Sequence, residues 1–521
     1  MSNTPMILTD FLDRAVHLYG NKPAIIDEEG TRYTYAKINK RVNQLSHGLA
    51  SLGVTKGDRV AYLAPNTLEM YEGFYGVFQV GAAMVSLNTR LKPQDYLYIL
   101  NHSESKVLFI DHELMSLIEP VIQEFKTVET IIVHGATAEK DNRIAYPDWL
   151  ESQSDEPFPR ADLDENDLAT LLYTSGTTGK PKGVMLTHRN NYMHALSAMH
   201  HLRVSDKDTL MHILPMFHVN GWGSPFYYTA NGATQVMQKH IEPALILDKA
   251  KKYGVTVMHM APTVLNGIID KFVETKPQIE QNVRIVLAGA APPQAFIKQV
   301  EEEIGWEFYQ VYGMTESSPL SLASYMSSED TDLTGDDYYY MKAKAGYEMI
   351  GTKVRVVNEF HQDVANDGTE VGEIIVKGNG VMEGYWKNEE ETNRTIVDGW
   401  LHTGDMGTID ERGRINVVDR KKDIIISGGE NISSIEVEGV FYEHPAVQEV
   451  AIIATPHEKW GETPHASVVL REGHMVTEQE LIDFSRERLA HFKCPKAITF
   501  MDELPKTASG KILKVKLREM V

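Results

Sequence analysis

The stretch LLYTSGTTGKPKGVMLTH (residues 171–188) decides the fold, because it joins two apolar runs through a segment that no ordinary strand connection needs. From Thr174 to Gly179 every residue carries a hydroxyl or is glycine, and Lys180 and Lys182 follow. Unhindered backbone N–H groups, hydroxyls and two ammonium groups together form a cradle for phosphate. The stretch is not the common G-x-x-x-x-G-K phosphate loop, because too few residues separate its glycines.

Short apolar runs alternate with helical patterns on both sides of this stretch. Residues 67–82 have the periodicity of an amphipathic helix. Residues 327–340, acidic and then aromatic, are expected to form a solvated loop or hairpin. The expected strands are mostly apolar on both faces and cover residues 58–65, 106–111, 129–135, 169–174, 255–262 and 283–292. Because such strands separated by helices are typical of covered parallel sheets, we predict an α/β fold with mostly parallel sheets flanked by helices.

Composition narrows the functional classes. The chain has 521 residues and a formal net charge of −22, which would repel nucleic-acid phosphates over most of the surface. It has no apolar run near the roughly 18 residues that span a bilayer, and its N-terminus lacks the basic segment of a secretory signal. The single cysteine, Cys494, excludes an intrachain disulfide and is interpreted as an ordinary loop thiol. We therefore expect a cytoplasmic protein without a nucleic-acid partner or a transmembrane segment.

The character of the chain changes at VVDRKKDIIISGGENIS, which is basic, then apolar, then glycine-rich. Two strand-like runs follow, and then a helix opened by a capping box of Thr477 and Glu480. These features predict a large N-terminal domain over residues 1–419 and a small, mobile C-terminal α+β domain over residues 420–521. The basic, short junction at about residues 420–423 is expected to be a hinge.

The opening stretch resembles the signature of the acyl-adenylate-forming (AMP-binding) superfamily, which includes acyl-CoA synthetases, firefly luciferase and the adenylation domains of peptide synthetases. The match continues in order along nearly the whole chain. It covers YTYAKIN (33–39), GAAMVSLN (81–88), LPMFHVNGW (214–222), GAAPP (289–293), YGMTES (312–317), GWLHTGD (399–405), DRKKDIIISGGENI (419–432) and PKTASGK (505–511). The series resembles the acyl-CoA synthetase, or fatty-acid–CoA ligase, branch.

The resemblance implies an enzyme that uses ATP and Mg2+ to activate a carboxylic acid as acyl-AMP and then transfers the acyl group to the thiol of coenzyme A. Nucleotidyl transfer needs mainly positioning and positive charge. The ATP β- and γ-phosphates are implied to bind Thr174, Ser175, Gly176, Thr177, Thr178, Gly179, Lys180 and Lys182. Thr315 would contact the α-phosphate, and Glu316 would coordinate Mg2+. The adenine and ribose are implied to bind Gly289, Ala290, Ala291, Pro292, Tyr312, Gly313, Asp405 and Arg420.

Four residues of the small domain have implied roles in the two reaction steps. Lys511 would reach the site during adenylation and reduce the repulsion between carboxylate and phosphate. Lys422 matches the family's hinge position. Gly428 and Gly429 would line the path of the CoA thiol after rotation, since only small residues let a pantetheine arm pass close to the backbone. The steps need different faces of the domain, which is why a hinge is implied.

His218 and Trp222 are implied to contact the acid. They would lie on one face if this stretch were helical. In the family the aromatic position of His218 lines the acid pocket, and some fatty-acid-activating members have a gating tryptophan where this chain has Trp222. His218 is assigned no base role, because a carboxylate has no proton to remove at neutral pH. The pattern favours a medium- to long-chain fatty acid, while plain aromatic packing of Trp222 stays an alternative.

Several functional alternatives stay open. A CoA ligase for a short, sulfur-containing, branched or aryl acid, and a stand-alone adenylating enzyme with another acceptor, share the first half-reaction. An amino-acid adenylation domain would need an acidic partner for the ammonium, and Asn220 stands where that branch usually has Asp. A luciferase-like oxygenase is excluded only weakly, whereas a non-enzymatic nucleotide-binding scaffold disagrees with the presence of both Lys511 and Glu316. A homodimer is one open form of assembly.

Overall fold

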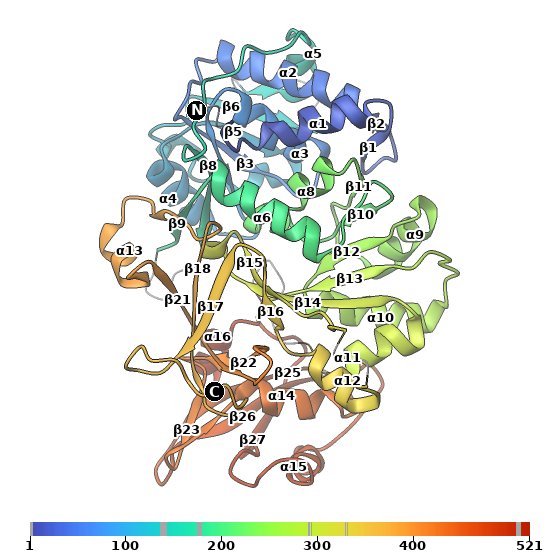
Figure 1. The fold of residues 1–521 in the computed structure, drawn as a ribbon, viewed down its shortest axis with the longest axis vertical. Helices are drawn as coiled ribbons and strands as arrows, with labels where there is room; N and C mark the ends of the chain where they lie inside the picture. Colours follow the sequence, from blue (N-terminus) through green and yellow to red (C-terminus); the bar gives the residue numbers. More distant parts are fainter. Residues whose placement is uncertain are drawn as a thin grey trace.

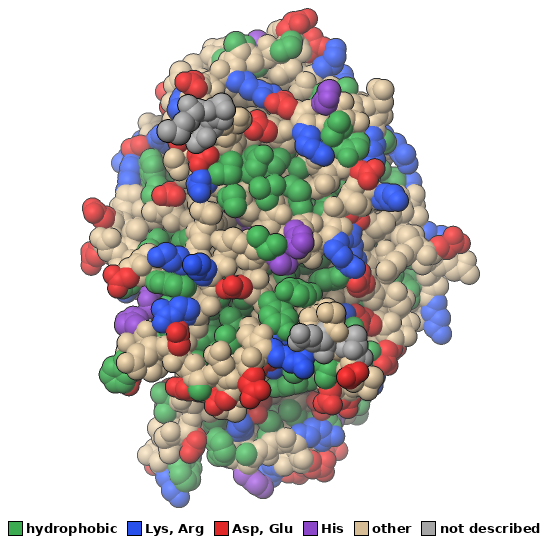
Figure 2. All heavy atoms as spheres, viewed as in Figure 1, with side chains coloured by type: hydrophobic (Ala, Val, Ile, Leu, Met, Phe, Trp, Pro, Cys, Tyr) green, Lys and Arg blue, Asp and Glu red, His purple; other side chains and the backbone are tan. Residues whose placement is uncertain are grey.

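The computed structural model describes residues 4–135, 143–174, 180–289, 292, 294–328, 330, 332–506 and 512–521. Two large sheets form the body of the molecule, and a smaller C-terminal unit lies at one end (Figure 1). Figure 2 shows acidic and basic side chains interspersed over one face, as expected when 51 basic residues accompany 73 acidic ones.

Nine strands among the described residues form the first large sheet, and the inner ones run parallel. Antiparallel strands lie at its two edges. The order is β16 (Tyr347–Glu348), β15 (Leu320–Ala323), β14 (Glu307–Gly313), β13 (Arg284–Leu287), β12 (Val257–Met260), β10 (Thr209–His212), β11 (Thr234–Met237), β1 (Pro23–Ile26) and β2 (Arg32–Thr34).

Eight strands among the described residues form the second sheet, again with a parallel interior. Its antiparallel edge pairs β8 with β9 and β9 with β19. The order is β19 (Gly384–Tyr385), β9 (Lys182–Thr187), β8 (Leu168–Thr174), β4 (Ala83–Ser86), β3 (Arg59–Leu63), β5 (Ser105–Asp111), β6 (Thr130–His134) and β7 (Ile144–Ala145). All six predicted strands are present in the two sheets, and the predicted fold class is confirmed.

Helices cover both sheets. They are α1 (Thr9–Tyr19), α2 (Tyr35–Ser51), α3 (Leu68–Gln79), α4 (Pro93–Ser103), α5 (Tyr146–Glu151), α6 (His188–His201), α7 (Val219–Trp222), α8 (Ser224–Ala230), α9 (Pro243–Tyr253), α10 (Pro262–Thr275), α11 (Gln294–Lys298), α12 (Gly335–Lys342) and α13 (Glu389–Thr395). The predicted helix over residues 67–82 is α3, which begins after its N-cap Thr67. It is not amphipathic, because contacts with α1, α2, β3 and β4 bury its residues from Met70 onward.

Residues 335–342 correct the prediction of a solvated loop or hairpin, because they form α12. Asp336 and Asp337 lie in its first turn, where a negative charge interacts favourably with the helix dipole. The Tyr339 ring is buried in the core that also contains Phe308, and its hydroxyl donates a hydrogen bond to Glu302 at 2.9 Å. The aromatic residues therefore anchor a helix to the body.

An antiparallel sheet connects the body to the C-terminal unit. It consists of β17 (Thr352–Val357), β18 (Gly372–Gly378), β20 (Ile396–Val397), β21 (Trp400–Ile409) and β22 (Ile415–Arg420). The next strand in the chain belongs to the last sheet, which contains β23 (Ile425–Ser427), β24 (Glu430–Ile432), β25 (Val447–His457), β26 (Gly461–Leu470) and β27 (Ala497–Phe500). Three helices pack with it: α14 (Ser434–Tyr442), α15 (Glu478–Arg486) and α16 (Lys514–Met520).

The C-terminal unit has its own core, made by residues such as Ile425, Phe441 and Val468. The predicted capping box is confirmed: the Thr477 side chain accepts from the Glu480 backbone, and Glu480 accepts from the Thr477 backbone at 2.7 Å. No helix in the described ranges is both long and apolar enough to cross a bilayer.

Several contacts join the C-terminal unit to the large domain, among them a hydrogen bond of 2.6 Å from the Ser434 backbone to Asp419. Arg471 donates to Asp270 of α10 at 2.5 Å, and the Asn266 side chain donates to the backbone oxygen of Gln448 at 3.1 Å. The rings of Phe296 and Tyr442 lie 5.5 Å apart. These contacts hold the C-terminal unit in the observed orientation.

Candidate active site

Lys180 and Lys182 lie at the base of the predicted phosphate loop, where β8 meets β9. Thr174 pairs with Lys182 across the hairpin, and residues 175–179 lie outside the described residues. The Lys180 ammonium is 5.1 Å from the ring centroid of Tyr98. The hairpin therefore presents two cations at the end of a buried strand.

A second element holds Lys182. Its ammonium forms an ion pair with Glu391 in the first turn of α13, and both side chains are mostly buried. It also lies 4.9 Å from the ring centroid of Tyr385. Although burial opposes it, hydrogen bonds from Arg394 and Lys182 lower the pKa of Glu391. Glu391 is therefore an ionised partner for this cation.

Glu316 is a buried carboxylate close to the same place. It lies in a short 3-10 turn with Thr315, and both residues are buried. The Tyr385 hydroxyl donates a hydrogen bond to Glu316 Oε1 at 2.8 Å. Burial raises the pKa of Glu316, and the bond from Tyr385 opposes the rise. Tyr385 thus joins Glu316 to Lys182 through one side chain.

Whether Glu316 could help to bind Mg2+ depends on which donor atoms surround it. The described residues contain no group of three or more His, Cys, Asp or Glu side chains that could hold a metal ion. A single carboxylate fits Mg2+, which keeps several waters and is commonly bound through one or two carboxylates plus substrate phosphates. Glu316 therefore fits the single carboxylate that a protein can supply to bound Mg2+.

The predicted ribose and adenine residues meet on three strands. Asp405 of β21 pairs with Arg420 of β22, and Arg420 Nε lies 3.2 Å from Asp405 Oδ1. Tyr312 of β14 donates its hydroxyl to Asp405 Oδ2 at 2.8 Å, and burial raises the Tyr312 pKa well above its ordinary value. At Gly313 a Cβ would lie 1.7 Å from the backbone oxygen of Pro319, so only glycine fits.

The structure describes part of the predicted adenine stretch. Gly289 has a φ of +98°, and a Cβ there would meet no described atom within 4 Å. Pro292 is buried, whereas Ala290 and Ala291 lie outside the described residues. The stretch follows β13, next to β14, which carries Tyr312. Gly289 and Tyr312 therefore come from the ends of neighbouring parallel strands.

His218 and Trp222 are not on one face of an ordinary helix. Val219, Gly221, Trp222 and Gly223 all have positive φ values between 44° and 74°, so α7 is a left-handed turn. This conformation is unfavourable for a β-branched or bulky residue. The Trp222 ring is buried and stacks on His259 at 5.8 Å. The stacking of Trp222 on His259 therefore occurs in a left-handed turn, to which the i, i+4 spacing of a right-handed helix does not apply.

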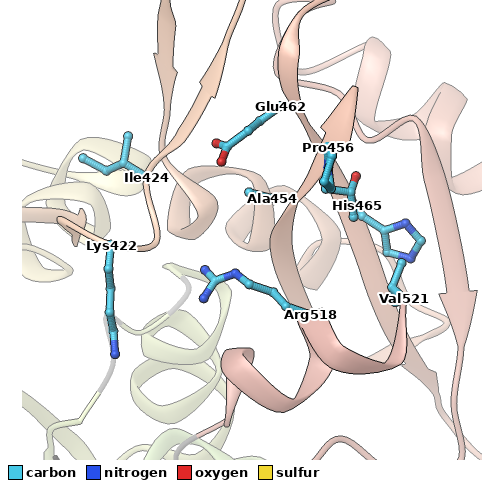
Figure 3. Close-up of a pocket in the computed structure, with 9 residues that line it drawn as sticks. Lys422, Ile424, Ala454, Pro456, Glu462, His465, Arg518 and Val521 are labelled. Atoms are coloured by element: carbon cyan, nitrogen blue, oxygen red, sulfur yellow. The ribbon is translucent and has the colours of Figure 1, made fainter. Parts of the chain in front are cut away.

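The small-domain residues are not all brought to Glu316. Gly428 and Gly429 form the turn of the β23–β24 hairpin, and β23 lies toward the opposite end of the molecule from β8 and β9 (Figure 1). Lys422 lines a cavity of about 520 Å3 with Ile424, Glu462 and Arg518 (Figure 3). Lys511 lies outside the described residues.

Sequence reasoning missed Tyr385 and Glu391. Both belong to the stretch GYWKNEEETNRT, whose acidic run and preceding aromatic residues follow the phosphate stretch by about 200 positions. The acidic run could have indicated a carboxylate that neutralises a nearby cation. Its partner became visible only when β19 paired with β9.

Comparison with known protein families defines the class of this enzyme. The AMP-binding enzyme family matches residues 12–386, and the C-terminal domain of AMP-binding enzymes matches residues 436–511. The chain therefore belongs to the AMP-binding enzyme family.

Relatives of this chain are CoA ligases for different acids. A long-chain-fatty-acid–CoA ligase of Thermus thermophilus is 37% identical, with 100% of this chain and 96% of the relative covered. A peroxisomal butyrate–CoA ligase of Arabidopsis thaliana is 36% identical, with 100% and 94% covered. The crystal structure of an anthranilate CoA ligase with anthranoyl-AMP has a TM-score of 0.92 and 27% identity, covering 100% and 98% of the two chains. The protein is an ATP-dependent acyl-CoA ligase. Its relatives are named as ligases for several classes of acid.

Proposed function

We propose that the protein activates an acid with a medium or long acyl chain as acyl-AMP, releases pyrophosphate, and transfers the acyl group to the thiol of coenzyme A. The observation that carries the proposal is the group formed by Lys182, Tyr385 and Glu316 at the base of the phosphate loop. It provides a cation and a carboxylate where a triphosphate and its metal need them.

Each nucleotide contact has a proposed role. Lys180 and Lys182 bind the leaving phosphates, and Thr315 contacts the α-phosphate. Tyr312 orients Asp405 through their 2.8 Å hydrogen bond, so that Asp405 and Arg420 hold the ribose hydroxyls. Gly289, Ala290, Ala291, Pro292 and Gly313 border the adenine. Bound Mg2+ would neutralise phosphate charge, and Glu316 is the residue proposed to hold it.

The two steps are proposed to use two orientations of the small domain. In the observed orientation β23, which leads into the Gly428–Gly429 turn, lies toward the opposite end of the molecule from β8 and β9 (Figure 1), and this orientation is proposed to be the one for adenylation. Rotation about residues 420–423, with Lys422 at the pivot, would bring the turn to the acyl-AMP. The domains are proposed to comprise residues 1–419 and 420–521, in support of which β22 ends at Arg420.

The size of the acid is argued from Trp222 and from the relatives. The buried Trp222 ring, stacked on His259, fits a gate that must move before an acyl chain enters. The relatives act on a long-chain fatty acid, on butyrate and on anthranilate, so a short or aryl acid is the alternative. We propose the cytosol as the compartment, which the single cysteine supports.

Isotope transfer tests the proposed chemistry. An acid labelled with oxygen-18 in its carboxylate should pass one label to AMP when ATP, Mg2+ and coenzyme A are present. Acyl-CoA should form only with coenzyme A, while exchange of pyrophosphate into ATP should occur without it. Label in ADP or phosphate, or acyl-CoA formation without AMP, would contradict the proposal.

A further inference from the structure

Three aromatic side chains from different elements gather behind Trp222. His194 comes from α6, Tyr227 from α8 and His259 from β12. The ring of Tyr227 lies 6.1 Å from that of His194 and 6.3 Å from that of His259. Trp222 stacks on His259 at 5.8 Å, so the group adjoins the proposed acyl gate directly.

Each of these side chains has one buried polar atom without a partner. His194 Nε2, Tyr227 Oη and His259 Nδ1 form no hydrogen bond within the described part of the chain. The residues are 4%, 0% and 2% exposed, so bulk water does not reach them in this state. Leaving such a group unpaired costs about 10- to 100-fold in an equilibrium constant, and native folds normally avoid it.

The hydroxyls of three neighbouring tyrosines, in contrast, have protein partners. The Tyr75 hydroxyl donates to the backbone oxygen of Pro225 at 2.8 Å. Tyr71 shares a hydrogen bond of 2.6 Å with Thr229. Tyr228 is bonded to His259 Nε2 at 3.2 Å, which leaves Nδ1 as the open atom of that imidazole. Three of the buried unpaired atoms thus belong to rings that lie next to one another behind Trp222, where the acyl group is proposed to lie.

Gly223 separates two of the three rings. A Cβ at this position would lie 3.0 Å from His194 Nδ1 and 3.7 Å from Tyr227 Cε1. Because Gly223 has no side chain, its backbone can lie close to both rings, directly after Trp222 in the chain. Movement of Trp222 would uncover His259, on which it stacks, and the rings of Tyr227 and then His194 follow behind His259.

The two imidazoles are neutral groups. Burial lowers the pKa of His194 and of His259 to about 3. At neutral pH they donate or accept hydrogen bonds without carrying a charge, and Tyr227 stays a phenol because burial raises its pKa well above the ordinary value. A second carboxylate would find no countercharge in this group. A hydroxyl, carbonyl or amide would find both donors and acceptors.

We propose that the acid carries a neutral oxygen-containing group on its acyl part, remote from the reacting carboxylate, which His194, Tyr227 and His259 bind after Trp222 moves. The inference rests on the proposed function and refines its substrate class from plain fatty acids to hydroxy- or oxo-acids. A site built to pair buried polar groups rejects analogues that lack the matching oxygen, because those groups then stay unpaired.

Matched acids of equal chain length test the proposal. The panel compares hexanoate with 5-oxohexanoate and 6-hydroxyhexanoate, and octanoate with 7-oxooctanoate and 8-hydroxyoctanoate. The rate of pyrophosphate release gives kcat/KM for each acid. At least one oxygenated acid should exceed its plain counterpart about tenfold or more. Plain acids that equal or exceed every oxygenated one would overturn the inference while leaving the CoA ligase function intact. If no acid of the panel caused acid-dependent release of pyrophosphate, this inference and the proposed function would both be overturned.

Two variants test the residues. Tyr227→Phe removes only the orphaned oxygen, and His259→Phe keeps a flat ring against Trp222. Each should reduce the preference for the oxygenated acid, measured as the ratio of its kcat/KM to that of the plain acid, at least fivefold. Tyr75→Phe is the matched control, because its hydroxyl already has a protein partner; it should lower the melting temperature without changing the preference. An unchanged preference in a folded Tyr227→Phe protein would contradict the proposal.

Discussion

Glu316 shows at the scale of one residue how a site stores an unfavourable charge. Its carboxyl is buried, and burial raises its pKa above the ordinary value of 4.5. The folded state therefore binds this proton more tightly than the unfolded state. The corresponding stability is present at low pH and is lost as pH rises through the raised pKa, so the ionised carboxylate destabilises the ligand-free protein at neutral pH.

Glu316→Gln should therefore stabilise the ligand-free protein at pH 8 while removing most adenylation activity. We expect a melting temperature about 2 °C higher at pH 8 and a smaller gain at pH 5, where the wild-type carboxyl is closer to neutral. Pyrophosphate release should fall at least about 100-fold. Melting curves at both pH values and a pyrophosphate assay check this. Glu383→Gln, at an exposed position, is the control, and equal gains at both pH values would argue against the stored charge.

Glu391 leads to a second prediction at this scale. Its carboxylate forms an ion pair with the Lys182 ammonium, and it would compete with the ATP phosphates that Lys182 is proposed to bind. Glu391→Gln should lower the KM for ATP about threefold, because a partly buried ion pair contributes about 1 kcal/mol and the phosphate site loses a negative charge. Steady-state kinetics over ATP concentration measure the effect. Glu390→Gln, exposed and adjacent, changes the same charge and should leave KM nearly constant; an equal fall would indicate a non-specific field effect.

Individual contacts were the least predictable part of the site. The motif pattern predicted Tyr312, Asp405, Arg420 and Glu316 as site residues, because their roles are tied to short local motifs. It did not predict Tyr385 as the hydrogen-bond partner of Glu316, since the two residues are 69 positions apart and meet through strand pairing. The unpaired atoms behind Trp222 were equally invisible, because a missing partner is a property of packing.

The β23–β24 hairpin carries the argument at the scale of one element. Gly428 and Gly429 have φ values of +62° and +89°, which suit a tight two-residue turn. A Cβ on Gly428 would lie 2.8 Å from the Trp460 ring, whereas a Cβ on Gly429 would meet no described atom within 4 Å. The two glycines therefore have different reasons to lack a side chain.

Gly429→Ala should separate the half-reactions. We expect pyrophosphate exchange within about twofold of wild type and thioester formation from synthetic acyl-AMP reduced about tenfold or more, because the methyl group would narrow the proposed thiol path. Gly473→Ala has the same positive-φ cost, about 1 kcal/mol, in another turn of the small domain and is the control. Equal loss of thioester formation in both variants would show that lowered stability, and not the path, is responsible.

Whole elements were predicted better than their surroundings. The six predicted strands followed from continuous apolar runs, because parallel strands are buried on both faces. The missed helix α12 lacks a clear apolar stripe, and its burial depends on Tyr339 reaching a distant core. The left-handed turn at Val219–Trp222 conflicts with local preference altogether. Such conflicts concentrate at functional sites, where the tertiary structure overrides the local rule.

The whole molecule depends on how firmly the small domain is held. The Arg471–Asp270 ion pair joins the residue that follows β26 to α10 and is partly exposed. Asp270→Asn should weaken the observed orientation by about 0.5 kcal/mol. Pyrophosphate exchange should fall about twofold, and thioester formation from synthetic acyl-AMP should not fall. Lys271→Gln, whose ion pair with Glu274 stays within α10, is the control. Parallel loss of both half-reactions would refute an orientation effect.

The thiol of Cys494 can serve as a chemical probe for opening of the small domain. It is the only cysteine of the chain, it is 1% exposed, and its thiol lies 3.5 Å from the backbone oxygen of Ala490. A thiol-labelling reagent can reach it only when this part of the domain opens. The labelling rate therefore reports opening events of the small domain without interference from the large one. If ATP or coenzyme A slows the labelling, the change in rate measures in the native protein how much each ligand suppresses opening of the small domain.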